Sequence, residues 1–143
     1  GTLDGANVEM HELLGDENMF LFGLKADEVE HLLHTYDPQL LYQRDPVLRR
    51  AVDTLKTGFR DGVTYEDIWQ RLLTDTDGPA DQYMVLADFA AYCDAESRMR
   101  HTYEDRNRWN AMSLTNIARS GVFAADRAIA QYADTIWHVP YKK

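Results

Sequence analysis

One short apolar run constrains most strongly what this chain can fold into. Residues 19–22 are all apolar and a glycine ends the run, a pattern typical of a strand buried on both faces of a sheet. Before it, the turn dipeptide Asp4-Gly5 is followed by a series of helix formers at residues 6–14. Residues 1–23 are therefore predicted to form one strand-turn-helix-strand step of an α/β sheet.

The remainder of the chain, residues 24–143, follows the helical period of 3.6 residues. Its apolar residues recur at spacings of three and four, which places them on single faces of successive helices. Helix starts are predicted by cap residues at Asp45, Thr64, Asp88 and Asp105. One or two short strands cannot form a sheet by themselves. The sequence therefore predicts that the partner strands lie in polypeptide preceding Gly1.

Charge and cysteine content exclude several classes of partner. Fifteen Lys and Arg against 24 Asp and Glu give a net charge of −9, which repels nucleic-acid phosphates and anionic membranes. Cys93 is the single cysteine, so an internal disulfide is impossible and a reducing compartment is expected. No apolar run in the sequence is long enough to span a bilayer.

A few side chains have the right chemistry for a site but not the right surroundings. His31 and His34 are three residues apart on a predicted helix, a spacing that can bring two imidazoles to one metal ion. Both project away from the apolar face, and zinc sites recruit a third or fourth protein ligand, so a solvated polar face is the preferred interpretation. Cys93 is interpreted as a small buried hydrophobic residue rather than a nucleophile. No glycine-rich phosphate loop or nucleophile elbow is present, so these patterns alone predict a helical chain without a visible active site.

Longer strings give a more specific indication. The first 23 residues contain GTLDGANVEM, then GDEN, then MFLFG. A second set near the other end includes NIA at residues 116–118, SG at 120–121, DR at 126–127, YA at 132–133 and IW at 136–137. In this order the strings resemble the segment that follows the cofactor lysine in α-glucan phosphorylases, and the resemblance runs through essentially the whole chain.

The resemblance implies a fold and an activity. The family has the GT-B architecture of two Rossmann-like domains, and residues 1–143 would be the C-terminal portion of the cofactor-bearing domain, with no second domain. The expected fold class is α/β, with this segment mostly helical and carrying one or two short strands. The whole enzyme would be a cytoplasmic homodimer and a glycosyltransferase. With inorganic phosphate it would release glucose 1-phosphate from the ends of glycogen, starch or maltodextrin, using pyridoxal phosphate.

The family's reacting groups do not carry over to this chain. The cofactor lysine lies in an EASGTGNMK string that is absent here, and none of Lys25, Lys56, Lys142 and Lys143 matches a family position. No catalytic, cofactor-binding or metal-binding residue is therefore expected. Asp4 and Asn7 are hypothesised to support the turn nearest the missing cofactor helix through side-chain to backbone hydrogen bonds, or else merely to cap the following helix. The alternative function is a free-standing helical interaction module without catalysis.

Overall fold

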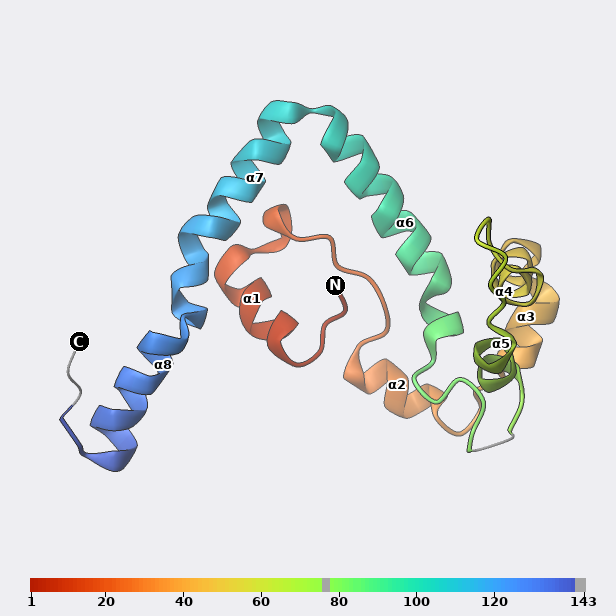
Figure 1. Cartoon of the computed structure of the whole chain (residues 1–143), viewed down its shortest axis with the longest axis horizontal. Helices are drawn as coiled ribbons and strands as arrows, with labels where there is room; N and C mark the ends of the chain where they lie inside the picture. The colour runs from red at the N-terminus through yellow and green to blue at the C-terminus, as the bar shows by residue number, and fades with distance from the viewer. Residues whose placement is uncertain (76–77, 141–143) are drawn as a thin grey trace.

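The computed structural model describes residues 1–75 and 78–140 and is predominantly helical. Helices α6 and α7 form an inverted V, with the N-terminus and α1 between its arms (Figure 1). Helices α3 to α5 cluster outside the α6 arm, and α8 continues beyond the free end of α7. The elements are α1 (Ala6–Leu14), η1 (Asp16–Asn18), α2 (Ala26–Leu32), α3 (Pro38–Arg44), α4 (Pro46–Thr57), α5 (Glu66–Leu73), α6 (Val85–Glu104), α7 (Arg106–Arg119), η2 (Ser120–Phe123), α8 (Ala125–Tyr132) and η3 (Ala133–Trp137).

Two of the predicted helix starts are confirmed by their caps. The Asp45 carboxylate accepts hydrogen bonds from the amides of Val47 at 2.8 Å and Leu48 at 3.1 Å, and Pro46 occupies the first helical position. Asp105 accepts in the same way from the first amides of α7. Such caps satisfy N–H groups that have no partner inside the helix.

The other two predicted starts are wrong. Helix α5 begins after Tyr65 rather than Thr64, and no side-chain cap is found for it in the part of the chain that the structure describes. Helix α6 begins at Val85, three residues before Asp88, because Asp81 supplies its cap from a turn upstream. Local spacing could not reveal this, since Asp81 acts from a left-handed backbone conformation with φ of 46°.

The predominantly helical character is confirmed, but the expected strands are not formed. Within residues 1–75 and 78–140 no strand occurs, and residues 19–22 run as an extended segment. This segment has one rung of pairing: the Gly1 amino group donates to the Phe20 carbonyl at 2.8 Å, and the Phe22 amide donates to the Gly1 carbonyl at 3.2 Å. A single rung without neighbouring strands is too little for a β-ladder.

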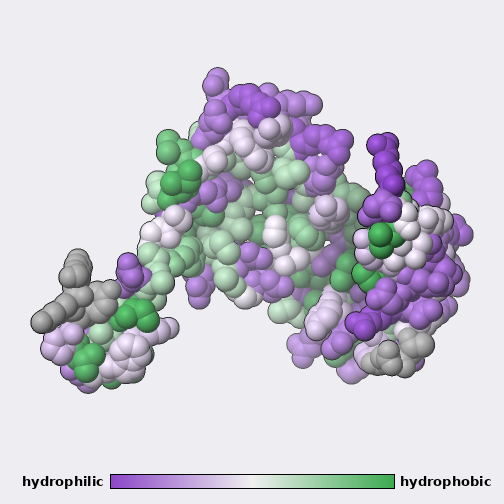
Figure 2. Space-filling model, viewed as in Figure 1, coloured by the Kyte–Doolittle hydropathy of each residue, from purple (hydrophilic) through white to green (hydrophobic). Residues whose placement is uncertain are grey.

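The hydrophobic core lies among α3, α4, α5 and the first turn of α6. Its fully buried members are Leu48, Val52, Leu73 and Leu86, each exposed by 5% or less. Figure 2 shows a mainly hydrophilic surface over this helical cluster, whereas apolar residues are visible between the arms of the V and on α8. Cys93 is exposed on α6, so its interpretation as a buried hydrophobic residue is wrong.

Candidate functional site

Two backbone hydrogen bonds join Gly1 to the extended segment 19–22. Because Gly1 donates to Phe20 and accepts from Phe22, it lies opposite Leu21 in the hydrogen-bond register of a parallel β-sheet. Although neither segment forms a strand, we call residues 1–3 and 19–22 the strand pair because of this register. In this register the backbone groups of Thr2 face away from residues 19–22. They are thus positioned to accept a further strand.

Side chains of α6 and α7 donate hydrogen bonds to the backbone of the extended segment. Arg98 on α6 donates from Nη2 to the Leu21 carbonyl at 2.9 Å, and its Nε is held 2.9 Å from Asp94 Oδ2. Asn116 on α7 donates to the Asn18 carbonyl at 3.1 Å. These contacts join residues separated by 77 and 98 positions in the sequence, so they fix the segment against the V.

The end of the segment is fixed by Asp88. Its Oδ1 accepts a hydrogen bond from the Leu24 amide at 2.8 Å. The neighbouring Gly23 has φ of +93°, and a Cβ there would lie 2.7 Å from Asp88 Oδ2. The backbone conformation therefore favours glycine at this corner, and an added Cβ would also force the Asp88 carboxylate to shift.

Aromatic contacts place one face of the extended segment on the V. Phe20 stacks on Trp109 of α7 with ring centroids 6.3 Å apart. Phe22 meets Tyr92 of α6 edge-on at 5.3 Å. Side chains two residues apart in an extended chain share a face, so both phenylalanines turn the same face toward the helices.

A largely apolar groove of about 860 Å³ opens beside the strand pair, and we call it the N-terminal groove. It lies between the N-terminal residues, α2 and the start of α6. Its walls are Thr2, Leu3, Asp4, Phe22, Leu24, Ala26, Val29, Tyr83, Val85, Asp88, Phe89 and Tyr92. Tyr83 is 81% exposed, and an open apolar surface of this kind is typical of a contact site for another segment.

The structure brings the two predicted support residues to the strand pair. Asp4 borders the N-terminal groove. Asn7 is partly buried and lies over Gly1, where an added Cβ would come within 3.1 Å of its Nδ2. The Asn7 amide donates to the Asp4 carbonyl at 3.0 Å, whereas among the described residues no side chain caps α1. Their position agrees with the support hypothesis, and their contribution to the turn stays a prediction.

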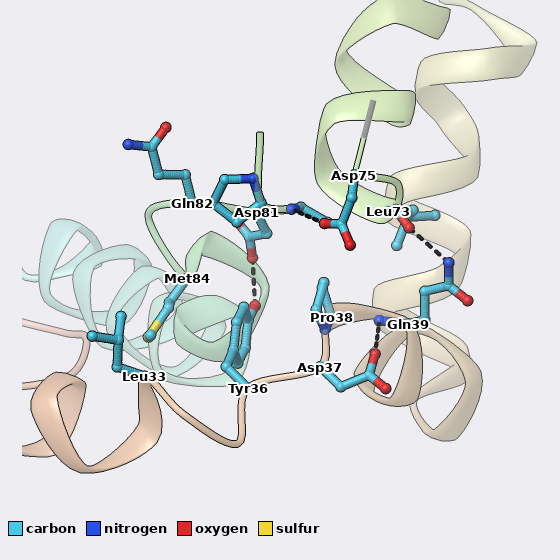
Figure 3. A pocket seen from close by; sticks show the side chains of 12 residues that line it. Leu33, Tyr36, Asp37, Pro38, Gln39, Leu73, Asp75, Asp81, Gln82 and Met84 are labelled. Atoms are coloured by element: carbon cyan, nitrogen blue, oxygen red, sulfur yellow. Dashed lines mark hydrogen bonds between the residues drawn. The ribbon is translucent and has the colours of Figure 1, made fainter. Parts of the chain in front are cut away.

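A second pocket, of about 580 Å³, lies where α2 and α3 meet the turn before α6 (Figure 3). There the Tyr36 hydroxyl donates to Asp81 Oδ2 at 2.5 Å. The same carboxylate, 4% exposed, accepts from the amides of Val85 at 2.9 Å and Leu86 at 2.8 Å. Burial, the hydrogen bond to Asp81 and its negative charge all raise the pKa of Tyr36 well above its ordinary value. Since Asp81 is already used by the fold, we interpret this pocket as a structural junction.

The described histidines and lysines lie apart from one another on exposed surfaces or beside single partners. His31 is exposed and its Nδ1 lies 2.6 Å from the Asp27 carbonyl. Over residues 1–75 and 78–140, no group of three His, Cys, Asp or Glu side chains could hold a metal ion. The Lys56 ammonium sits 3.9 Å from the Trp69 ring centroid on an exposed surface, and Lys25 is exposed at the start of α2.

These surroundings do not fit pyridoxal phosphate. A lysine that forms a Schiff base needs desolvation or another means of lowering its pKa, and neither described lysine is enclosed. Lys142 and Lys143 lie outside the described residues. We therefore derive no chemical step through the cofactor on this chain.

The geometry defines a class: a mostly helical chain with an open parallel strand pair and exposed apolar surfaces. The model of the family described as "Phosphorylase: Carbohydrate phosphorylase" matches residues 1–139. The chain belongs to this family.

Individual relatives agree with the family match. The chain is 39% identical to a glycogen phosphorylase of Chlamydia pneumoniae over 99% of its own length and 17% of the relative's. It is 41% identical to a glycogen phosphorylase of Bacillus subtilis, over 97% of this chain and 17% of the relative. For the muscle form of Bos taurus the identity is 41%, over 97% of this chain and 16% of the relative. The chain therefore spans about a sixth of the length of the curated relatives it matches.

Sequence reasoning missed the side chains that shape the site. Arg98 was part of a run of arginines with ordinary acidic neighbours, and Asp88 had the pattern of a helix cap. Their true partners lie 77 and 64 positions away. The apolar run at residues 19–22, interpreted as a buried strand, and the family strings in the first 23 residues were the signals that pointed to this region.

The structure contains no helix, among those described, that is long and apolar enough to cross a bilayer.

Proposed function

We propose that this chain is the C-terminal segment of an α-glucan phosphorylase and that it completes the Rossmann-like domain carrying the cofactor. The observation that carries the proposal is the parallel register between Gly1 and Leu21. Parallel strands occur almost only in sheets covered by helices on both faces. A solitary rung of this type is therefore best explained as the edge of a larger sheet, in keeping with the GT-B architecture.

The activity that we propose belongs to the whole enzyme. Inorganic phosphate would release glucose 1-phosphate from the end of an α-1,4-glucan, and pyridoxal phosphate would supply its phosphate group to the reaction. The attachment lysine would lie on the remainder of the polypeptide, because the described lysines of this chain are exposed rather than enclosed in a pocket. The enzyme would act as a cytoplasmic homodimer.

A segment exchange tests this role. The matching segment of the Bacillus subtilis glycogen phosphorylase is replaced by residues 1–143, and glucose 1-phosphate release from maltodextrin and phosphate is measured. We expect activity from the exchanged enzyme, none from the isolated chain, and none from the relative with the segment deleted. Activity of the isolated chain, or an exchanged enzyme that binds the cofactor in a folded state and does not turn over, would contradict the proposal.

The same exchanged enzyme tests Asp4 and Asn7. We propose that they support the turn at the strand pair, because Asp4 borders the N-terminal groove and Asn7 lies over Gly1. Asp4→Ala and Asn7→Ala should lower both the rate and the bound cofactor, whereas Asp27→Ala on the exposed side of α2 should change neither. Unchanged rate and cofactor content in the first two variants would remove the support role.

A further inference from the structure

The two outer edges of the strand pair differ in their hydrogen bonding. On one edge, the register directs the backbone groups of Thr2 away from residues 19–22, and Thr2 lines the N-terminal groove. On the opposite edge, the Leu21 carbonyl already accepts a hydrogen bond from Arg98. Successive residues of an extended chain direct their N–H and C=O groups to opposite sides. Leu21 is therefore the residue through which a strand would pair on the side opposite Gly1.

Arg98 is well placed to close that edge. Its guanidinium is oriented on one side by Asp94 at 2.9 Å and on the other reaches the Leu21 carbonyl at 2.9 Å. The planar fork of an arginine side chain can satisfy both acceptors at once. A charged side chain at the edge of a sheet is also a known means of preventing the addition of another chain.

Further contacts hold residues 19–22 in place beside Arg98. Asn116 donates a hydrogen bond to the carbonyl just before the apolar run, and Asp88 accepts one from the amide of Leu24 after it. Phe20 and Phe22 rest on aromatic rings of α7 and α6. The outer edge is thus kept at a fixed distance from α6, where Arg98 can reach it.

We propose that Arg98 is an edge-capping residue that ends the sheet at Leu21 and confines strand addition to the Thr2 side. The occupant of the Thr2 side is one parallel strand from the remainder of the phosphorylase polypeptide. This identification of the occupant rests on the proposed function, and continuity with the Gly1–Leu21 register supports it. The closure by Arg98 rests on the contacts of this chain alone.

The closure is tested on the full 143-residue chain with a matched pair of variants. Arg98 and Arg100 both lie on α6 and both pair with an acid four residues earlier, but it is Arg98 that contacts Leu21. Arg98→Ala should accelerate self-association into species with an intermolecular β-sheet infrared signal roughly tenfold, because the Leu21 carbonyl loses a charged donor. Arg100→Ala should match the parent chain, and Arg98→Lys should restore part of the protection. Equal association rates for the Arg98→Ala and Arg100→Ala chains would overturn the assignment.

A second pair of variants decides the matter if Arg98→Ala loses its helical circular dichroism. Asp94→Ala releases Arg98 from its orienting carboxylate, and Glu96→Ala does the same for Arg100. The hydrogen bonds of these two carboxylates go to Arg98 and Arg100 rather than to residues 19–22. Faster β-type association of the Asp94→Ala chain alone is expected, and identical behaviour of the two variants would overturn the closure.

Amide hydrogen exchange tests whether the added strand pairs on the Thr2 side. The isotope-labelled chain is mixed with the Bacillus subtilis relative from which the matching segment has been deleted. We expect slower exchange at the Thr2 amide and unchanged exchange at the Leu21 amide. Protection at Leu21 instead of Thr2 would overturn the edge assignment. Protection at neither amide would contradict docking and hence the proposed function, while the arginine variants would still decide the closure.

Discussion

Similar apolar side chains are buried in the α3–α6 cluster and exposed in the C-terminal arm. In the cluster, Leu48 is 2% exposed and Val52 is 4% exposed. In the arm formed by α8 and η3, Ile129 is 44% exposed and Ile136 is 62% exposed, although both lie on an amphipathic pattern. The difference is the presence of packing partners in the same chain. An apolar stripe indicates that a helix face is to be buried, and it does not indicate which polypeptide buries it.

Substitution of a core leucine should give the largest contrast between these regions. Leu48→Ala removes a side chain packed among α3, α4, α5 and α6, and such changes destabilise by about 3 kcal/mol through lost burial and a residual cavity. Ile136→Ala in the arm should change the free energy of unfolding by less than about 0.5 kcal/mol. Urea unfolding followed by circular dichroism measures both, and similar losses in the two variants would break the comparison.

A smaller effect is expected at the junction that joins the cluster to α6. Asp81→Ala leaves the Tyr36 hydroxyl and two α6 amides without their acceptor, which should destabilise by about 2 kcal/mol. Asp81→Asn keeps an acceptor oxygen and tolerates the left-handed backbone, so it should lose less. Thermal unfolding compares the two variants. Equal losses would show that the charge of Asp81, rather than its capping geometry, holds the junction.

The smallest effect is an alkaline dependence at the same junction. The pKa of Tyr36 is raised by burial and by Asp81, so the unfolded chain loses this phenolic proton first as the pH rises. Stability from Tyr36 is therefore fully present below the ordinary tyrosine value of 10.0 and declines above it. Because Tyr36 is only about half buried, solvent screening keeps this decline below the two effects above.

Urea titrations on both sides of that pH measure the dependence. Tyr36→Phe should flatten the decline without abolishing it, since the pKa of Tyr42 is also raised, chiefly by its hydrogen bond to Asp53. A parent chain whose stability rises above the ordinary tyrosine range would contradict the assignment.

The sequence allowed correct prediction where structure depends on neighbours in the chain. The caps at Asp45 and Asp105 follow from local spacing, and both are observed. Prediction failed where a side chain serves a distant element. Asp88 has every local property of a helix cap, yet its carboxylate holds the Leu24 amide. The strand at residues 19–22 failed for a related reason, since a ladder requires neighbours that this chain does not provide among its described residues.

In the candidate site too, the sequence could not reveal contacts between residues far apart in the chain. The resemblance to phosphorylases placed Asp4 and Asn7 at the turn nearest the missing cofactor helix. In the structure Asn7 lies over Gly1 and Asp4 borders the N-terminal groove, and their support role stays a prediction. The resemblance could not identify Arg98, because a guanidinium that bonds to a backbone carbonyl leaves no trace in residue spacing. Recognition of such contacts requires coordinates.

The core described above is contributed entirely by residues 41–89, a continuous stretch of the chain. Its contacts all fall within this stretch, and helical units of this kind collapse in microseconds to milliseconds. A ribosome adds only about 5–20 residues per second. This cluster can therefore fold while α7 and α8 are still being synthesised, and it would be finished before the C-terminal arm exists.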